Sequence, residues 1–498
     1  MEMIFSLLLD ILNPEVLLLI ILGVTVGIIG GALPGISSTT TVALVATFAY
    51  SMKTVPAILF LAATQVGSTY GGSITAVVLN IPGTPVSAAT ALEGYPMAKR
   101  GEGERALAIN IASSFWGNTL GAIFLVFIMP IALKISLSFG SWEMFWFSIF
   151  AIVICAQLSR KNFVKGLFAA ALGLIVSFVG MDPIHGFGAL RFTYGINHLK
   201  DGIQLVPAMV GLYGMSEVFT SLTKKAGKPV DITKSKVFTE FKNVWRYKWL
   251  ALRVSVLGFI IGIIPGVGSN IASWVGYNHA SSTSKNPDKF GTGYIEGLVG
   301  SEASNNACVP GTYAPLLSLG VPGDGVTAVV LSVLTVQGIQ MGSGFMQHNP
   351  GFIELLSLAF IISGIVFVFI GSIAGKGLVR ALSIPLPSIL AVVVCLCAIG
   401  AYSTSNSIAD IRLMFIFGLI GLAMNAFQFP IAPMIIGIVV GGSLVDATFR
   451  RAFIAGKGSL APFFTRPASL ILIVFLLVLL FLEYGWKHVK SMLHKNKN

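Results

Sequence analysis

The feature that most constrains this chain is a hydrophobic stretch, between residues 27 and 85, that Gly, Pro, Ser and Thr interrupt repeatedly. It reads G-I-I-G-G-A-L-P-G-I-S-S-T-T-T from residue 27 and T-A-V-V-L-N-I-P-G-T-P from residue 75, after a Gly-rich segment at 67–73. Its apolar runs 39–50, 56–66 and 74–81 are each shorter than the ~20 residues that a spanning helix needs. Non-helical backbone at membrane depth is tolerated only where protein or a wet cavity surrounds it. The stretch therefore predicts half-helices or a re-entrant hairpin, broken at 67–73.

The same pattern returns in the second half of the chain. The sequence G-F-I-I-G-I-I-P-G-V-G-S-N at 258–270 aligns Pro265 with Pro34, and V-P-G-D-G at 321–325 aligns Pro322 with Pro82. The offset between the copies grows from 231 to 240 residues, so about nine extra residues fall in the polar stretch 281–306. Interrupted hydrophobic segments at matching positions of two halves are the best sequence indicator of a transporter's binding site.

The composition excludes a soluble protein, because 55% of the 498 residues are hydrophobic and only 10% are charged, against about 25% in soluble domains. We therefore predict an all-α polytopic membrane protein with two repeats of broken helices and re-entrant hairpins plus scaffold helices. The predicted scaffold runs are 106–129, 142–158, 163–181, 203–222, 352–374, 386–402, 411–429, 431–445 and 468–485. The expected division is a first repeat unit at 1–105, scaffold at 106–222, a basic loop at 223–253, a second repeat unit at 254–350, scaffold at 351–485 and a basic tail at 486–498.

Loop charge predicts how the repeats are oriented. The net charge is +12, but most basic residues lie in short loops, which indicates cytosolic loops at 99–105, 159–165 and 223–253 and not nucleic-acid binding. The first unit ends at a basic loop, whereas the matching end of the second unit, 337–350, has no Lys or Arg. The second unit also begins after the most basic loop, and the first begins after a segment without basic residues. The copies are therefore expected to be inverted. The side of the C-terminus stays open, and the N-terminus, which lacks a basic region and a cleavage site, reads as mature chain.

The longest motifs resemble the TctA family, the large membrane subunit of the tripartite tricarboxylate transporters. They are P-G-I-S-S-T-T-T, G-S-T-Y-G-G-S-I-T-A-V-V-L-N-I-P-G-T-P and S-E-A-S-N-N-A-C-V-P-G-T-Y-A-P-L-L-S-L-G-V-P-G-D-G. The resemblance covers nearly the whole chain. It implies a cation-coupled secondary importer of carboxylates in the bacterial inner membrane. It also implies two partners, a small four-helix membrane subunit and a periplasmic solute-binding protein, and it does not specify the carboxylate.

The residues that follow Pro34 and Pro265 predict the substrate site. Both segments read as helix starts, where free N–H groups and a partial positive charge can bind a carboxylate without a basic side chain. The tips of the two hairpins could point toward the same site. The alternative is that these hydroxyls only cap helices and let them pack closely. The candidate substrate-binding residues are Ser37, Ser38, Thr39, Thr40, Asn80, Thr84, Ser269, Asn270 and Asp324.

A second cluster predicts a site for the coupling ion. Residues 301–306 read S-E-A-S-N-N and are dense in oxygen ligands, beside a Gly-Pro-rich break that would free backbone carbonyls. An ionisable group at membrane depth is a functional hypothesis by default, although Glu302 could instead lie at the aqueous end of its segment. Asp324 is either a helix cap or a cation or proton site. The expected ion is sodium rather than a proton, no other cofactor is expected, and the candidate ligands are Ser68, Thr69, Glu302, Ser304, Asn305 and Asn306, with Ser68 and Thr69 as the first-copy equivalents.

Two other classes of function compete with a carrier. An intramembrane protease would need a His facing Ser37 in the membrane or a Gly-x-Gly-Asp motif, and His279 lies where the sequence is already polar. No H-E-x-x-H zinc motif is present, so we expect no enzyme. An anion channel is the stronger rival, but inverted broken-helix repeats with asymmetric polar clusters favour alternating access around a central site.

Overall fold

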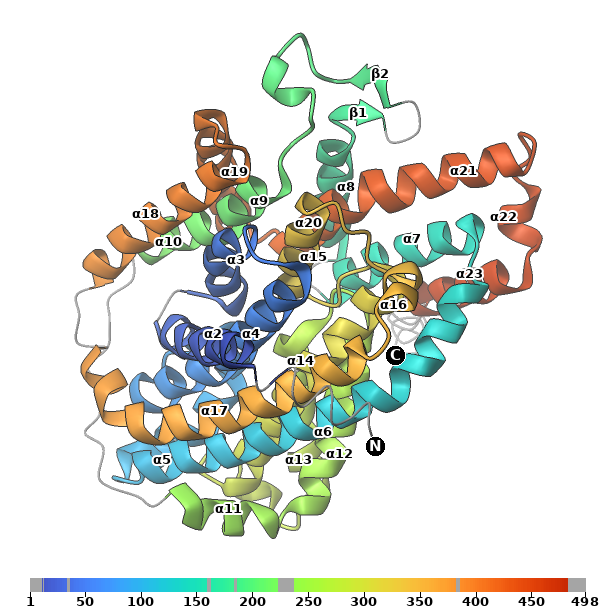
Figure 1. Ribbon diagram of the computed structural model, residues 1–498. Helices are drawn as coiled ribbons and strands as arrows, with labels where there is room; N and C mark the ends of the chain where they lie inside the picture. Colours follow the sequence, from blue (N-terminus) through green and yellow to red (C-terminus); the bar gives the residue numbers. More distant parts are fainter. Residues whose placement is uncertain are drawn as a thin grey trace, which may run out of the picture. The chain divides into compact units, whose positions relative to one another are not determined.

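The computed structural model describes residues 11, 13–33, 36–158, 163–182, 186–222, 237–381 and 386–481. Pro34, Gly35, the tail 486–498 and parts of the predicted cytosolic loops, 159–162 and 223–236, lie outside the described residues. The described chain is helical (Figure 1), as predicted, except for a ribbon of two antiparallel strands, β1 (Gly180–Asp182) and β2 (Gly186–Arg191). This ribbon was not predicted, because the apolar run up to residue 181 was interpreted as a helix.

The chain divides into two compact units. The first unit comprises residues 1–133 and 204–432, and the second comprises 134–203 and 433–498. The helices of the first unit are α2 (Pro14–Ala32), α3 (Ser38–Ala49), α4 (Thr54–Leu79), η1 (Pro85–Ser87), α5 (Ala88–Lys99), most of α6 (Gly103–Ser138), α9 (Leu205–Met209), η3 (Val210–Met215), α10 (Ser216–Ser221), α11 (Val237–Trp245), α12 (Lys248–Ile263), α13 (Gly268–Thr283), η4 (Pro287–Lys289), α14 (Ile295–Leu319), α15 (Gly325–Val336), α16 (Ser343–His348), α17 (Phe352–Ala381), α18 (Leu386–Ser405) and α19 (Ile408–Ala426).

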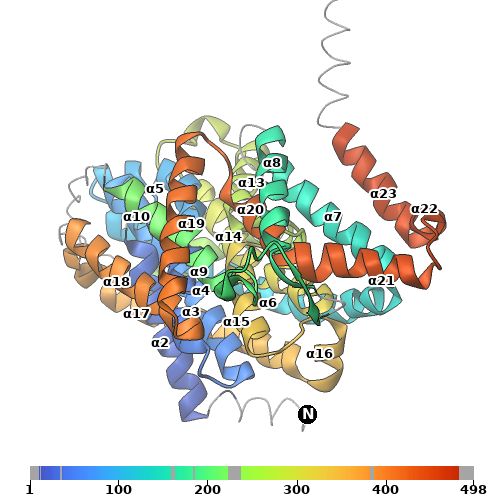
Figure 2. The same ribbon diagram turned by 90° about the horizontal axis from the view of Figure 1, so that it is seen from above.

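The second unit is built around α7. Its helices are α7 (Ser141–Leu158), α8 (Phe163–Ser177), η2 (Asn197–Leu199), most of α20 (Ile431–Val440), η5 (Gly441–Asp446), α21 (Ala447–Ala455), α22 (Ala461–Thr465) and α23 (Pro467–Leu480). Helix α7 contacts α8, α21 and α23 (Figure 2). Phe145 of α7 lies edge-on to Phe463 with ring centroids 5.4 Å apart, so aromatic packing holds the C-terminal helices onto α7.

Several described helices can cross a membrane. Four are long and apolar enough: Pro14–Ala32, Gly103–Ser138, Phe352–Ile373 and Ile408–Ala426. The pair Ile431–Val440 and Leu444–Ala455, bent by 50°, adds a fifth span if it counts as one. The prediction of a multi-pass membrane protein is confirmed, with α6 reaching beyond both ends of the predicted run 106–129.

Helix α4 shows that the predicted break at 67–73 is wrong. The helix runs without interruption from Thr54 to Leu79, so the runs 56–66 and 74–81 are one helix and not two halves. The glycines allow close approach to α2 instead of breaking the helix. A Cβ atom added to Gly27 or Gly31 would lie less than 3.0 Å from a backbone oxygen of α4, that of Thr64 or Ser68. Small residues at an interface of membrane helices permit this backbone-to-backbone packing.

Helices α12 and α14 make the same contacts. A Cβ atom added to Gly258 or Gly262 would lie less than 3.0 Å from the backbone oxygen of Ser304 or Cys308. These glycines follow Gly27 and Gly31 by 231 residues, and these oxygens follow those of Thr64 and Ser68 by 240. The two helix pairs therefore share both their sequence pattern and their line of contact.

The helix ends match as well. Helices α2 and α12 end at Leu33 and Ile264, whose φ and ψ angles are −82° and 116°, and −79° and 115°. Helices α4 and α14 both end in the left-handed region, at Asn80 with φ 56° and at Gly320 with φ 69°. A single left-handed residue is a common helix terminator. The sharp turn after each long helix therefore recurs in both copies.

The predicted basic loop 223–253 is largely helical where it is described. It contains α11 and the first turns of α12. Apolar residues at 237, 238, 241, 244 and 245 follow the helical period, which favours an amphipathic helix. Phe241 packs edge-on against Phe115 of α6 with ring centroids 5.8 Å apart. The loop prediction rested on basic residues alone and overlooked this period.

Candidate functional site

The start of α3 is fixed by its own hydroxyl groups. Ser37 caps the helix, because its Oγ accepts a hydrogen bond of 3.1 Å from the Thr40 backbone N–H. Its hydroxyl also pairs with that of Thr40 at 2.8 Å. These two predicted site residues therefore serve the helix end, as the capping alternative expected. Ser38 is buried, and its Oγ has no hydrogen-bond partner among the described residues.

The start of α15 is held by Asp324. Its Oδ1 accepts from the Thr327 N–H at 2.8 Å, and its own N–H donates to Thr327 Oγ1 at 2.8 Å, which forms a capping box. Its other oxygen accepts from Gln65 Nε2 of α4 at 3.0 Å. The cap reading of Asp324 is confirmed, and Gln65 is a partner that the sequence analysis missed.

Three helix starts lie close to Asp324. A Cβ atom added to Gly325, the first residue of α15, would lie 3.0 Å from Thr39 Oγ1 of α3 and 2.8 Å from Tyr213 Oη. A Cβ atom added to Gly268, the first residue of α13, would lie 2.9 Å from the Asp324 Cβ. Gly268 also has a φ of +66°, which favours glycine. The starts of α3, α13 and α15 therefore meet, and they bring Thr39 and Asp324 together.

The other predicted substrate residues fall into two groups. Thr84 and Ser269 are buried, and Thr84 Oγ1 has no hydrogen-bond partner among the residues that the structure describes. The Ser269 hydroxyl lies beside the Cys308 thiol, a weak hydrogen-bonding group, and has no other partner in the described part of the chain. Asn80 and Asn270 are exposed, and Asn80 forms the C-terminal cap of α4.

The carboxylate of Glu302 is enclosed by three hydroxyl groups that the sequence analysis missed. Ser73 of α4 donates to Oε1 at 2.6 Å and Ser114 of α6 donates to Oε2 at 2.8 Å, while Thr90 of α5 donates to Oε1. All four side chains are fully buried. Glu302 is therefore enclosed by protein and not exposed to solvent. Two helices of the first copy, α4 and α5, and the scaffold helix α6 converge on an acid of the second copy.

The neighbours of Glu302 on α14 are buried too. Asn306 Nδ2 donates to the Glu302 backbone oxygen at 3.0 Å and to Asn305 Oδ1 at 2.5 Å. Asn306 Oδ1 has no hydrogen-bond partner within the described chain. Ser304 Oγ donates instead to the Ala272 backbone oxygen of α13 at 2.8 Å. The hydroxyl oxygen of Ser304 keeps its lone pairs when it donates, so this oxygen and the two amide oxygens all have capacity left for a cation.

The Gly-Pro-rich break predicted beside these residues is absent from the described helix. Helix α14 runs continuously from Ile295 to Leu319 through Pro310 and Pro315. A proline has no N–H, so the Asn306 carbonyl loses its usual donor at position 310. The expected free carbonyl therefore arises within a helix and not at a break.

The predicted first-copy equivalents are shifted by one turn. The glycine contacts place Thr64 where Ser304 lies, so Ser68 corresponds to Cys308 and Gln65 to Asn305. Thr69 Oγ1 donates to the Gln65 backbone oxygen at 2.9 Å, whereas Ser68 Oγ is buried without a hydrogen-bond partner among the described residues. The equivalence of Ser68 and Thr69 to Ser304 and Asn305 was therefore wrong.

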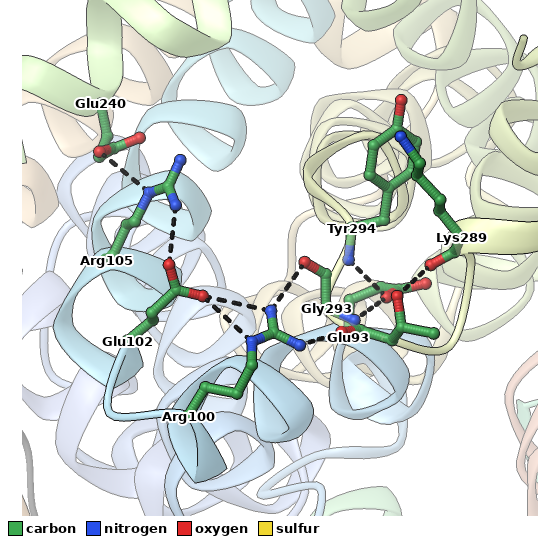
Figure 3. A network of polar contacts seen from close by, with 9 residues as sticks. Glu93, Arg100, Glu102, Arg105, Glu240, Lys289, Gly293 and Tyr294 are labelled. Atoms are coloured by element: carbon green, nitrogen blue, oxygen red, sulfur yellow. Dashed lines mark hydrogen bonds and ion pairs between the residues drawn. The ribbon is translucent and has the colours of Figure 1, made fainter. Parts of the chain in front are cut away.

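A separate network joins the first copy to the second (Figure 3). Glu240 of α11 pairs with Arg105 at 3.5 Å, Arg105 pairs with Glu102 at 2.9 Å, and Glu102 pairs with Arg100 at 3.2 Å. Arg100 in turn donates to the Gly293 backbone oxygen, at 3.4 Å, in the loop before α14. The network thus links α6 and α11 to the extra residues of the second copy.

Glu93 anchors the same loop. This fully buried side chain on α5 accepts hydrogen bonds of 2.7 Å from the backbone N–H groups of Gly293 and Tyr294 (Figure 3). It accepts a further one of 2.6 Å from the N–H of Gly291. It also accepts from the Tyr277 hydroxyl of α13 at 2.8 Å. Hydrogen bonds to a charged group are the stronger kind. Glu93 therefore joins α5 of the first copy to the loop at 284–294 and to α13 of the second copy.

The contact between α5 and the loop at 284–294 forms one junction of the two copies. The matching junction, between the end of α15 and the linker at 50–53, is held by a neutral side chain. Gln337, after α15, donates to the backbone oxygens of Ala49 and Met52 at 3.1 and 3.0 Å. The linker there is short, at 50–53, whereas its counterpart at 284–294 carries most of the extra residues. The two junctions therefore differ in charge and in length.

Comparison with known proteins agrees with the motifs. The sequence model of the tripartite tricarboxylate transporter TctA family matches residues 17–436. An Agrobacterium vitis protein described as "Uncharacterized 52.8 kDa protein in TAR-I ttuC' 3'region" is 30% identical over 459 residues, which cover 92% of this chain and 91% of that protein. A second one, "Uncharacterized protein in TAR-II ttuC' 3'region", is 31% identical over 212 residues, 43% of this chain and 87% of that protein. No solved structure matches the chain. The resemblance predicted from the motifs is confirmed: the chain belongs to the TctA family, and it is the large membrane component of a tripartite tricarboxylate transporter and not an enzyme.

Proposed function

We propose that this protein imports a carboxylate into a bacterial cell across the inner membrane, driven by sodium. It would receive the carboxylate from a periplasmic solute-binding protein and act together with a small four-helix membrane subunit. The family supplies the tripartite setting. The observation that carries the proposal is the meeting of the starts of α3, α13 and α15, which provides N–H donors and partial positive charge for a carboxylate.

The substrate would be held between these helix starts. Buried polar groups nearly always have hydrogen-bond partners, so buried hydroxyls without one indicate places for a ligand or a water molecule. Ser38 and Thr84 are such hydroxyls. Asp324 already accepts three hydrogen bonds from side chains and backbone, so its role would be to fix the start of α15.

Sodium would be held on α14. Asn305 Oδ1, Asn306 Oδ1 and the Asn306 carbonyl are neutral oxygens of the kind that suits a weakly held monovalent cation. The oxygens of Glu302 are occupied by three hydroxyl donors, so Glu302 would balance the positive charge of the sodium ion without binding it directly. A proton remains the alternative coupling ion, with Glu302 as its carrier.

The two copies would be inverted repeats. Their movement would expose the central site to each side of the membrane in turn and so carry the substrate across. The matched glycine contacts and helix ends support a repeat, and the loop charges support the inversion. Lys99 and Gly344 are both exposed and lie at equivalent ends of the two copies. In a variant without native cysteines, Lys99→Cys is expected to react with an impermeant thiol reagent only from the cytosolic side, and Gly344→Cys only from outside. Labelling of both cysteines from the same side would contradict the proposed inversion.

Uptake by the complete system tests the transport proposal. The protein would be reconstituted in proteoliposomes with its membrane partner and its solute-binding protein, and given a panel of carboxylates under an imposed sodium or proton gradient. Accumulation above equilibrium that follows sodium is expected. Flux that only equilibrates would indicate a channel, and accumulation that ignores sodium and follows protons would make Glu302 the coupling site.

Two single variants separate the two sites. For each variant, the dependence of uptake on the carboxylate is measured with sodium saturating, and the dependence on sodium with the carboxylate saturating. Ser51→Ala, at the exposed end of α3, is the matched control. Ser38→Ala should raise KM for the carboxylate about tenfold, because a hydrogen bond to a charged group is worth ~1.5–3 kcal/mol, and leave half-saturation by sodium unchanged. Asn305→Ala should raise the sodium concentration for half-maximal uptake, and saturating sodium should partly restore the rate. Equal changes in both constants in both variants would contradict separate sites.

A further inference from the structure

An apolar cavity of about 270 Å³ lies where α11 meets α12, beside α6. Its lining includes Trp116, Trp245 and Trp249, with Val244 and Leu252 among the aliphatic residues. One charged residue, Lys248, belongs to the lining as well. The carboxylate and sodium sites proposed above use none of these residues.

The tryptophans and Lys248 form one arrangement. The rings of Trp116 and Trp245 lie 4.9 Å apart, and the Lys248 ammonium lies 5.4 Å from the Trp245 ring and 5.8 Å from the Trp249 ring. The Trp116 indole N–H is buried and has no acceptor among the described residues. Because a buried tryptophan N–H usually finds a partner, this donor is available to an oxygen atom of a ligand that enters the cavity.

The outer face of this region has the character of a membrane interface. Trp245 and Trp249 are 51% and 69% exposed. Lys242, Arg246 and Lys248 are exposed beside them. Tryptophan is enriched at the headgroup level of membranes, and clustered basic residues beside an amphipathic helix attract anionic lipids.

The helix that carries this face is held in place. The ion pair of Glu240 with Arg105 at 3.5 Å and the packing of Phe241 on Phe115 tie α11 to α6. In Figure 1, α11 lies near α5 and α6. The cavity between the tryptophans is therefore a preformed slot and not a surface that must order on binding.

We propose that this slot binds an anionic phospholipid. One acyl chain would fill the space between the tryptophans, an ester oxygen would accept from the Trp116 N–H, and the phosphate would lie at Lys248. The apolar lining argues against free phosphate, and the positive charge at the rim argues against a zwitterionic lipid.

Brominated lipids test the proposal, because bromine on an acyl chain quenches tryptophan fluorescence on contact. The protein would be placed in phosphatidylcholine vesicles with a rising fraction of dibrominated phosphatidylglycerol, or of dibrominated phosphatidylcholine for comparison. In the wild type, the phosphatidylglycerol curve is expected to saturate at a lower fraction than the phosphatidylcholine curve. Coinciding curves would overturn the proposal.

Variants then assign the effect to the slot. Lys248→Gln should raise the phosphatidylglycerol fraction for half-maximal quenching about fivefold, as expected for one basic residue near the surface. Lys289→Gln, whose ammonium likewise lies 5.8 Å from a ring, that of Tyr294, is the matched control and should behave as wild type. Trp116→Phe should weaken the preference without removing the cavity. Competition by glycerol phosphate, which lacks acyl chains, or an unchanged curve in Lys248→Gln would show that no lipid site exists here.

Discussion

Replacing Glu302 with alanine is expected to abolish uptake and to lower the thermal stability of the protein. The substitution leaves the buried hydroxyls of Ser73, Thr90 and Ser114 without their acceptor. A buried donor without a partner costs about 1–3 kcal/mol, so three such donors cost about 3–9 kcal/mol in total. That is a large part of a typical stability of about 5–15 kcal/mol.

The measurement is the apparent melting temperature in detergent, together with uptake per folded protein. Glu302→Gln keeps one acceptor oxygen and should fold better than Glu302→Ala while still transporting poorly. Glu296→Ala, on the same helix but only partly buried, is the control and should match the wild type in stability. Wild-type stability and uptake in Glu302→Ala would refute both the structural and the coupling role.

The second large effect is expected at Gly258. A Cβ atom there would lie less than 3.0 Å from the Ser304 backbone oxygen, a separation that real Cβ atoms essentially never show. Because the obstacle is helix backbone and not a flexible side chain, α12 and α14 would have to separate. Overpacking typically costs about 1–3 kcal/mol, and Gly258→Val should exceed that range and prevent folding.

Gly258→Ala is the milder variant, and its recovery from the membrane and its melting temperature are measured. Gly27→Ala, at the matching position of α2, should cost a similar amount, because its Cβ meets the Thr64 oxygen in the same way. Gly344→Ala meets no atom within 4 Å and serves as the control. Unequal effects at Gly27 and Gly258 would mean that the two helix pairs do not pack equivalently.

Much of the fold could be predicted from the sequence, because helices and turns leave local patterns and the second copy repeats the motifs of the first. The starts of α3 and α13 and the turn after α4 lie where the motifs predicted them. The error at 67–73 has a physical cause: glycine accompanies both a broken helix and a closely packed one. The neighbouring helix decides between them, and in this protein α2 lies against Gly67 and Gly71.

The surroundings of the candidate sites were less predictable. Ser114 lies 188 positions before Glu302 in the sequence and Thr90 lies 212 positions before it. No spacing rule connects residues so far apart. Gln65 could have been suspected, because an amide in an apolar run needs a partner, but the sequence does not identify Asp324 as that partner. Trp116 and Trp245 are brought together by the fold alone.

The unequal junctions of the two copies have a consequence for the resting protein. Opening the junction at Glu93 breaks four hydrogen bonds to a buried carboxylate, whereas opening the one at Gln337 breaks two bonds to a neutral amide. Bonds to charged groups are worth about 1.5–3 kcal/mol and neutral ones about 0.5–1.5 kcal/mol, so separating the helices costs more free energy at the Glu93 junction than at the Gln337 junction. In the alternating-access cycle proposed above, the junction at Glu93 would therefore be the harder of the two to open.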